Sequence, residues 1–174
     1  ALPICHSREI LNRLGENGRL YAFDQDADAL NNTIDDPRFT LIHQNFKYLK
    51  QYLRFYGVSE VDGVLGDFGV SSHQFDVAER GFSTRFEGAL DMRMNQEQEL
   101  DAYQIVNTYS FEELCRILRE YGEEKFTKSI ARAIEKHRAI QPIETTFQLV
   151  DVIKSALPDK VLRQKGHPAK QTFQ

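Results

Sequence analysis

The sequence predicts an α/β fold followed by a module of helices. Up to about residue 100, short apolar runs typical of buried strands alternate with segments of helical periodicity, and after that point only helical patterns follow. Strands that alternate with helices imply right-handed crossovers and a largely parallel sheet. With 174 residues, 28% of them charged and 41% hydrophobic, the chain has the size and composition of a globular protein with one core and a small subdomain.

Capping residues and one apolar run predict the first three elements. Ser7 is a favoured N-cap for a helix at residues 7–14, and glycines form the turn after it. Residues 19–24 (RLYAFD) form an apolar run that ends in a carboxylate, as expected of a buried strand. Asp26 caps the next helix, which the Asp-Pro pair at residues 36–37 ends.

The alternation continues through three further elements. Residues 39–43 (FTLIH) predict a second strand, and residues 46–56 place apolar side chains at helical spacing. Residues 61–65 (VDGVL) predict a third strand.

The helical module is predicted from two capping boxes. Residues 110–113 (SFEE) and residues 145–148 (TTFQ) each place a hydroxyl three positions before Glu or Gln, and so each opens a helix. Between them, residues 123–138 carry apolar side chains on one face. Pro158 ends the last helix, and the polar residues 95–99 form the only linker-like stretch.

Composition limits the class of protein. The net charge of −4 argues against a surface that is basic overall, although a local basic face remains allowed. Cys5 and Cys115 are far apart and match no zinc or redox spacing, so both are expected to be reduced thiols and no metal is expected. No apolar stretch reaches the roughly 18 residues of a membrane span. A cytoplasmic protein without a membrane partner is therefore expected.

The segment between Asp67 and Met94 has the composition of a binding site. It interleaves arginines, acids, serines and phenylalanines around glycines, an order that neither a buried strand nor a simple surface loop requires. The segment follows the predicted strand at 61–65 and so leaves the carboxyl end of that strand. Open α/β sheets bind their ligands at this end.

Two residues at the ends of the earlier strands are candidates for binding a nucleoside. Asp24 ends the strand at 19–24, where a carboxylate can accept both hydroxyls of a ribose. The alternative is that Asp24 or Asp26 is a helix cap or a loop acid. Phe46 could stack on an adenine, but the local pattern alone favours a core residue on an amphipathic helix.

The long segment itself carries further candidates. Asp67 could accept a hydrogen bond from an amine, although an Asp after a strand is often a cap or turn residue. Gln74 offers a donor and an acceptor together, which suits a base edge or an amino-acid moiety. The arginines could bind phosphates or pair with nearby acids, and internal pairing is expected for at least one of them: Arg80, Arg85 and Arg93.

Motifs along nearly the whole chain match one known family in the same order. They are residues 23–26 (FDQD), 61–76 (VDGVLGDFGVSSHQFD), 79–83 (ERGFS), 90–94 (LDMRM), 119–126 (REYGEEKF), 130–134 (IARAI) and 167–174 (HPAKQTFQ). With these motifs the chain resembles the bacterial 16S ribosomal RNA cytosine-N4 methyltransferase family (RsmH, formerly MraW).

The resemblance implies a class I, Rossmann-like S-adenosylmethionine-dependent methyltransferase fold with an inserted all-α domain. Residues 1–99 would be the N-terminal part of the methyltransferase domain, residues 100–165 the inserted helical domain and residues 166–174 the return into the first domain. The implied reaction is methylation of the exocyclic N4 of a cytidine in the decoding region of 16S rRNA, within the small ribosomal subunit. The oligomeric state is left open, a homodimer included.

The resemblance also assigns residues to the cofactor. Those expected to bind S-adenosylmethionine are Cys5 and His6 beside the methionine moiety, Asp24 on the ribose, Phe46 beside the adenine, and Asp67 and Gln74, which complete the site. Asp67 is also the candidate catalytic carboxylate that polarises the cytosine amine, and its cofactor role competes with this assignment.

The helical module is expected to hold the RNA. Lys128, Arg132 and Lys136 recur every four residues on the exposed side of the helix at 123–138, where they could meet phosphates. A solvated face paired with acids explains the same spacing equally well. Phe68 or Phe82 could stack on a splayed-out cytidine.

The N-terminus departs from the family pattern. The family has Gly-Gly-His-Ser after its first strand, whereas residues 4–7 here are ICHS, with no glycine and no strand before them. The chain also stops before the later strands of the family, so an incomplete fold is expected. We favour a fragment of a longer enzyme over a degenerate paralogue acting as a non-catalytic RNA-binding or ribosome-binding module. An oxidoreductase ranks third, because no Gly-x-Gly-x-x-Gly is present.

Overall fold

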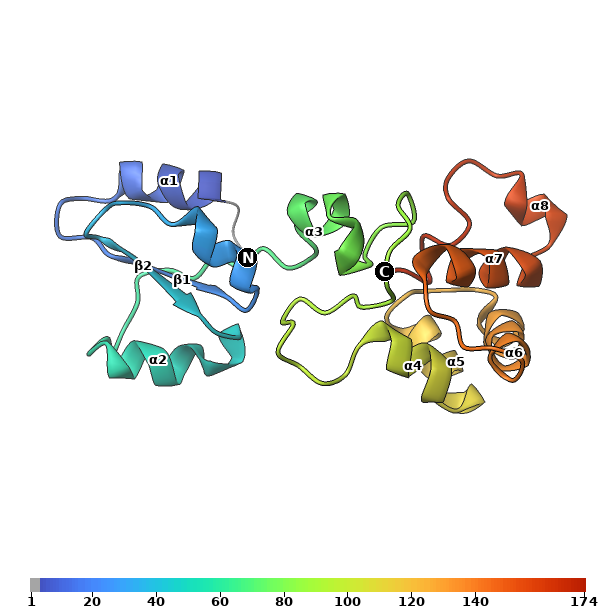
Figure 1. Cartoon of the computed structure of the whole chain (residues 1–174). Helices are drawn as coiled ribbons and strands as arrows, with labels where there is room; N and C mark the ends of the chain where they lie inside the picture. The colour runs from blue at the N-terminus through green and yellow to red at the C-terminus, as the bar shows by residue number, and fades with distance from the viewer. Residues whose placement is uncertain (1–3) are drawn as a thin grey trace. The chain divides into compact units, whose positions relative to one another are not determined.

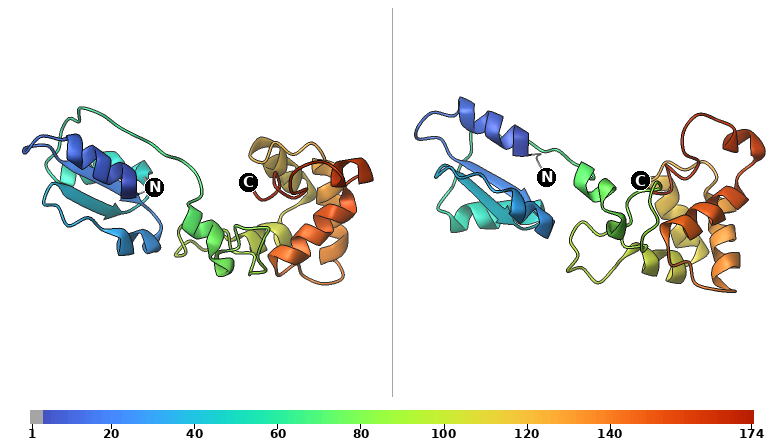
Figure 2. Two further views of the ribbon diagram at one scale, coloured as in Figure 1. Left: turned by 90° about the horizontal axis from the view of Figure 1, so that it is seen from above. Right: turned by 45° about the horizontal axis from the view of Figure 1, so that its top comes forward.

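The computed structural model describes residues 4–174 and divides into two compact units. Unit 1 consists of Ala1–Ser71 and Met94–Glu97, and unit 2 of Ser72–Arg93 and Gln98–Gln174. Unit 1 contains the sheet and unit 2 contains most of the helices (Figures 1 and 2).

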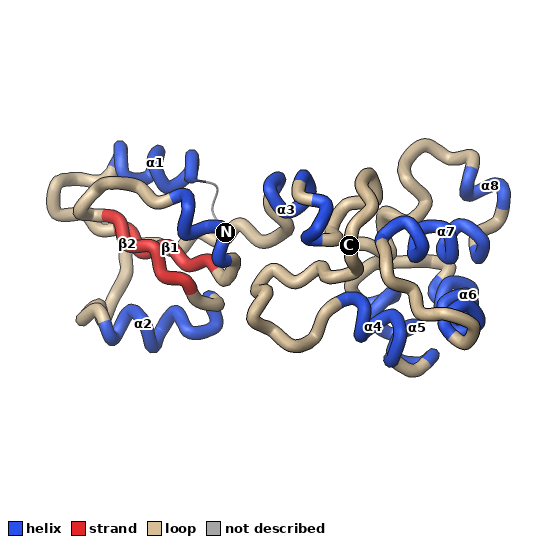
Figure 3. Tube along the Cα trace, viewed as in Figure 1, coloured by secondary structure: helices blue, strands red, loops and turns tan. Residues whose placement is uncertain are grey.

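Unit 1 is built on a parallel pair of strands (red in Figure 3). These are β1 (Leu20–Asp24) and β2 (Phe39–His43), at the places that the apolar runs predict. The register sets Asp24 opposite His43, so that both strands end at the same edge. The polar residues that follow each strand therefore start from neighbouring points.

Helices lie on both faces of this sheet. Figure 1 shows α1 on one face and α2 on the other. Asp26 caps a short 3-10 helix rather than an α-helix, and the predicted helix at 46–56 begins as a 3-10 turn before it becomes α2. The helices of unit 1 are α1 (Ile4–Arg13), η1 (Ala27–Asn32), η2 (Phe46–Tyr48) and α2 (Leu49–Phe55).

The prediction of a third strand at residues 61–65 is wrong for the described chain. These residues form no strand, and the side chains of Val61, Val64 and Leu65 are exposed. An apolar run becomes a strand only when a neighbour pairs with it and a layer covers it, because β-propensity depends on both. The run at 61–65 has neither, and it contains Gly63, a residue depleted in strands.

Unit 2 is helical, and α5, α6 and α7 form its core. Leu114 on α5, Ile130 and Ile134 on α6, and Ile153 on α7 are almost completely buried. The apolar face predicted within residues 123–138 is confirmed at Ile130 and Ile134. The helices of unit 2 are α3 (Ser72–Asp76), η3 (Ala78–Arg80), α4 (Ala102–Thr108), α5 (Phe111–Glu120), α6 (Thr127–Arg138), α7 (Thr146–Ala156) and α8 (Asp159–Leu162).

Both predicted capping boxes are present. Ser110 exchanges hydrogen bonds with Glu113 at the start of α5, and Thr145 does so with Gln148 at the start of α7. The α6 helix starts later than predicted, because Glu123 has a φ of 51° and helical geometry does not continue through a left-handed residue. Among the described residues, no helix is long and apolar enough to cross a membrane.

The segment from η3 to α4 is anchored to the first turn of α7. The Thr146 hydroxyl donates to the carbonyl oxygen of Phe86 at 2.8 Å and accepts from the Gly88 N–H at 3.1 Å. The Thr146 N–H donates to the Gly88 carbonyl at 2.9 Å, and the Leu90 N–H donates to the Glu144 carbonyl at 3.1 Å. This segment has little regular structure of its own, and these bonds to α7 fix its course.

Candidate functional site

The carboxyl edge of the sheet carries a hydrogen-bonded polar cluster. Gln25, the residue after β1, accepts through Oε1 from the Asn45 side-chain amide at 2.8 Å. The backbone oxygen of Gln25 lies 3.2 Å from Nε2 of His43, the last residue of β2. Gln25 therefore joins the ends of the two strands. Gln25 was not singled out from the sequence, because its role rests on contacts with His43 and Asn45 at the end of the next strand.

Asp24 projects from this edge as a half-buried carboxylate. Its Oδ1 accepts the backbone N–H of Asp26 at 2.9 Å. The helix cap is Asp26, whose own carboxylate accepts the Asp28 N–H at 3.1 Å. Of the two acids, Asp26 is therefore the helix cap, and Asp24 is the carboxylate that ends β1.

Phe46 is an exposed ring at the end of β2. It is 57% exposed, so it is not a core residue of its helix. Its ring centroid lies 5.3 Å from that of Phe68, with the planes tilted by 51°. Asn45 caps η2 by accepting the Lys47 N–H at 2.9 Å, which places Phe46 at the start of that turn. Unit 1 therefore presents two aromatic faces beside the polar edge.

The other expected cofactor residues belong to other segments of the chain. Cys5 and His6 are exposed in the first turn of α1, and within the described chain no hydrogen bond or ring contact connects them to Asp24. Asp67 is exposed in the stretch after residues 61–65. Gln74 is in α3 of unit 2 and only 4% exposed. Asp24 ends β1 and Phe46 follows β2, so both start from the same edge of the sheet, and Phe68, the neighbour of Asp67, contacts the Phe46 ring.

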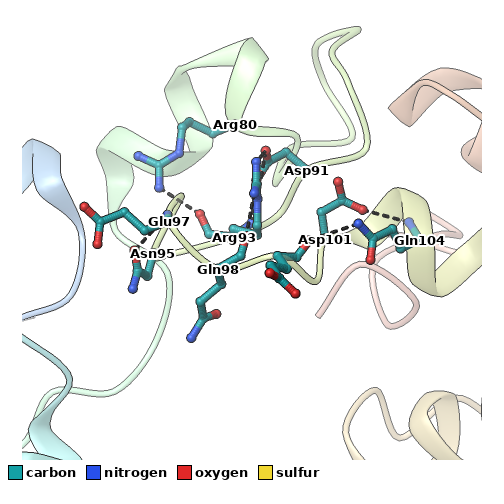
Figure 4. A network of polar contacts seen from close by, with 9 residues as sticks. Arg80, Asp91, Arg93, Asn95, Glu97, Gln98, Asp101 and Gln104 are labelled. Atoms are coloured by element: carbon teal, nitrogen blue, oxygen red, sulfur yellow. Dashed lines mark hydrogen bonds and ion pairs between the residues drawn. The ribbon is translucent and has the colours of Figure 1, made fainter.

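The arginines of the long segment make contacts within unit 2, and Figure 4 shows those of Arg80 and Arg93. Arg93 clasps Asp91, with Nε 3.1 Å from Oδ1 and Nη2 2.6 Å from Oδ2, and donates through Nη1 to the Gln98 carbonyl at 2.6 Å. Arg80 donates through Nη2 to the Arg93 carbonyl at 2.9 Å. The expectation of internal pairing is confirmed for Arg93.

The clasp at Arg93 shifts the protonation equilibria of both partners. Partial burial alone would raise the pKa of Asp91, but the hydrogen bonds from the Arg93 side chain and backbone outweigh it, and the pKa of Asp91 lies below its ordinary value. The hydrogen bond from the guanidinium to Asp91 raises the pKa of Arg93 in turn. The pair is therefore fully ionised at neutral pH.

The residues of this segment differ in their exposure. Arg80 is only 3% exposed, and Phe82 is only 7% exposed, so the Phe82 ring is not open to stacking. Arg85 reaches solvent, pairs with Asp76 at 3.0 Å and lies over the ring of Phe86. Of the two rings proposed for base stacking, Phe68 is the exposed one.

The three cations of α6 lie on the face that their spacing predicts. Lys128, Arg132 and Lys136 are all exposed. The Arg132 guanidinium lies 5.8 Å from the centroid of the Phe111 ring. Residues 4–174 contain no group of three or more His, Cys, Asp or Glu side chains that could hold a metal ion.

These features define the class of the protein as a mixed α/β protein with a small parallel sheet and a polar cluster at the carboxyl edge of that sheet, in a chain that also has a helical unit. The chain belongs to the MraW methylase family, whose profile matches residues 4–174.

Two curated relatives are similar to most of the chain. Over 163 residues it is 57% identical to ribosomal RNA small subunit methyltransferase H of Christiangramia forsetii, covering 91% of this chain and 54% of the relative. Over 156 residues it is 56% identical to the protein of the same name from Flavobacterium johnsoniae, covering 90% of this chain and 52% of the relative. The chain thus spans about half the length of the curated relatives it matches.

Proposed function

We propose that the chain is part of an S-adenosylmethionine-dependent methyltransferase that modifies the N4 amine of a cytidine in the decoding region of 16S rRNA. The observation that carries the proposal is the pairing of a carboxylate at the end of β1 with an exposed aromatic ring at the end of β2, in a chain of this family. The names of both relatives, ribosomal RNA small subunit methyltransferase H, support an RNA substrate.

The sheet edge fits the nucleoside part of the proposed cofactor. The Asp26 N–H holds Oδ1 of Asp24 in place, and a fixed carboxylate suits the vicinal hydroxyls of a ribose. Phe46 offers an exposed face for the adenine. Under this proposal Cys5 and His6 lie beside the methionine moiety, and Asp67 and Gln74 complete the site.

The chemistry assigned to the protein is positioning and electrostatics. The cofactor supplies an electrophilic methyl group when it is bound. The cytosine amine is a poor nucleophile, because its lone pair is delocalised into the ring, so the protein must orient it and accept an N–H hydrogen bond as charge develops. Asp67 is the proposed acceptor, in competition with its role toward the cofactor.

The same proposal assigns a role to each part of the chain. Residues 1–99 belong to a Rossmann-like methyltransferase domain, residues 100–165 form the inserted helical domain and residues 166–174 return to the first domain. The RNA is held by exposed side chains of the long segment and of α6, with Phe68 as the stacking ring. The exposed cations proposed for this contact are Arg85, Lys128, Arg132 and Lys136. Arg80 and Arg93, which the sequence also suggested, are left out because Arg80 is only 3% exposed and Arg93 is bonded to Asp91. We place the reaction in the cytoplasm, and the proposal does not include a homodimer, which no observation supports.

Asp24→Ala tests the cofactor assignment. Calorimetric titration with S-adenosylmethionine is carried out on a version of the chain extended to the length of its relatives, with Asp35→Ala as the control because Asp35 is an exposed acid in the same unit. We expect Asp24→Ala to weaken binding at least about tenfold, since charged hydrogen bonds contribute about 1.5 to 3 kcal/mol, and Asp35→Ala to leave binding unchanged. Equal affinities for both variants would remove Asp24 from the site.

A non-catalytic RNA-binding module is the second candidate. It is favoured by one observation: residues 4–7, where the family has its glycine pair, lie in helix α1. In that case the extended protein binds RNA with unchanged affinity in both variants and has no affinity for S-adenosylmethionine. The same titrations therefore separate the two functions.

A further inference from the structure

A hollow of about 500 Å³ lies on unit 2 where α5 leads into α6. Cationic side chains line it from three successive places: Arg119 in the last turn of α5, Lys125 in the connection, and Lys128 in the first turn of α6. Ser129, whose hydroxyl can donate a hydrogen bond, also lines it. The two helices pack against each other, so the lining residues have a rigid support.

The lining is positive although the chain as a whole is acidic. The net charge of the chain is −4, whereas the hollow combines three cations with one carboxylate, that of Glu124. Glu124 is buried, and its Oε1 accepts the Phe126 N–H at 2.9 Å. This carboxylate is therefore committed to the backbone at the start of α6.

The three cations are also uncompensated. Among the described residues, no ion pair joins Arg119, Lys125 or Lys128 to an acid. Two other cations of the same helices do have ion pairs: Arg116 lies 3.1 Å from Glu120 and Arg138 lies 3.8 Å from Glu135. Mutually repelling cations gathered around a hollow are stabilised by an anion that occupies it.

We propose that this hollow binds a phosphate group of an RNA backbone. The inference rests on the proposed function, and it adds a defined anchor for the RNA that includes Arg119 and Lys125 as well as Lys128. A guanidinium fork can hold two phosphate oxygens, the ammonium groups supply point charges, and Ser129 supplies a neutral donor. The start of α6 contributes backbone N–H groups of the favourable sign.

The test removes the three charges together. The triple variant Arg119→Gln, Lys125→Gln, Lys128→Gln is compared with Lys160→Gln, Arg163→Gln, Lys165→Gln, which removes the same charge from exposed residues of unit 2 outside the hollow. The affinity of the chain for a fluorescent single-stranded RNA is measured by anisotropy over a series of KCl concentrations. All six side chains are exposed, so the fold should persist, and far-UV circular dichroism checks this.

We expect the triple variant at the hollow to bind at least about tenfold more weakly at low salt. Its slope of log affinity against log salt should fall by about 0.7 for each phosphate that the variant no longer neutralises. The control variant should bind about twofold more weakly or less, because it removes only long-range attraction. Single substitutions at Arg119 and Lys125 should each produce part of the decrease in affinity.

Three results would overturn the inference. Equal decreases in affinity for the two triple variants would show that only net charge matters, and the proposed function would stand without this anchor. Displacement of the RNA by polyglutamate at lower concentrations than by unlabelled RNA would identify an acidic protein surface as the better occupant. Failure of the unaltered chain to bind RNA would overturn the RNA side of the proposed function together with the hollow.

Discussion

Asp36 is a carboxylate whose pKa is determined mainly by one neighbour, Arg38. Arg38 donates through Nε to Oδ1 at 3.0 Å and through Nη2 to Oδ2 at 2.7 Å. The same guanidinium donates to the Leu14 carbonyl at 3.2 Å, so it links the connection before β2 to the turn after α1. The side-chain hydrogen bond from Arg38, reinforced by its backbone N–H, lowers the pKa of Asp36 from 3.8 to about 2.

This shift predicts an acid-sensitive contact in unit 1. Because the pKa is lower in the folded state, the stability that Asp36 contributes is present above pH 3.8 and is lost as the pH falls toward about 2. An NMR titration of the side-chain carboxyl carbon should give a midpoint near pH 2. Asp36→Asn should remove this part of the pH dependence of the thermal midpoint, and Asp35→Asn at the exposed neighbour should retain it. A midpoint at or above pH 3.8 for Asp36 would contradict the prediction.

At the level of single residues, the sequence predicted the location of a candidate site residue where that residue ends a predicted strand. Asp24 was found because a carboxylate at a strand end has a definite place, and the structure puts it there. Phe46 was ambiguous because helical spacing alone cannot tell a covered face from an open one, and it is open. Gln25 was missed because its importance depends on Asn45, a residue that follows the next strand.

At the level of elements, the starts of α5 and α7 were predictable because a capping box is written in four consecutive residues. The boxes of α5 and α7 are both present. The N-cap predicted at Ser7 was wrong, because α1 already includes Ile4 and Ser7 lies buried inside this helix. The third strand was not predictable, because residues 61–65 would need a hydrogen-bonded neighbour that no local pattern specifies. The start of α6 was misplaced because the left-handed turn at Glu123 was not marked by a glycine at that position.

Arg138 joins two elements of the helical unit. Its Nη1 donates to the Val106 carbonyl at 2.7 Å and its Nη2 to the Tyr109 carbonyl at 2.6 Å, so the last turn of α6 caps the end of α4. The side chain is only 16% exposed. Replacing it leaves carbonyl groups at the C-terminal end of α4 without this partner.

Arg138→Met should therefore destabilise the helical unit by about 1.5 to 3 kcal/mol, the range for hydrogen bonds to charged groups. Urea unfolding followed by circular dichroism measures the change. Arg116→Met is the matched control, because Arg116 forms an exposed i,i+4 pair with Glu120, and such pairs contribute about 0 to 1 kcal/mol. Equal destabilisation in the two variants would show that the bonds from Arg138 to the carbonyl groups add nothing beyond a surface ion pair.

At the scale of the whole molecule, the change from strands to helices was predictable and the division into two units was not. The switch in apolar periodicity marks where helices take over. The boundary at residues 71–72 falls inside the long segment, where the sequence has no linker composition, and Met94–Glu97 groups with unit 1. Which part of an irregular segment associates with which core depends on contacts such as those of Thr146, and these join residues far apart in sequence.

The structure also predicts that backbone amides of residues 61–68 and of α6 differ in their protection from hydrogen exchange. Residues 61–68 are exposed and have no regular structure, whereas α6 is covered by α5 and α7 and contains fully buried Ile130. Hydrogen exchange followed by mass spectrometry should show residues 61–68 exchanging at close to the rate of an unstructured peptide, and the amides of α6 exchanging last. Slow exchange at residues 61–68 in the isolated chain would contradict this description.

Because Thr146 holds the long segment, the conformation of that segment depends on the first turn of α7. A side chain with no exposed surface holds the backbone on both sides of residue 87. Any event that unwinds the first turn of α7, such as loss of the Thr145 cap, would also release the stretch that carries the Asp91 and Arg93 clasp. Insertions engineered into this unit would therefore be tolerated better in the exposed stretch after α8 than between residues 86 and 90.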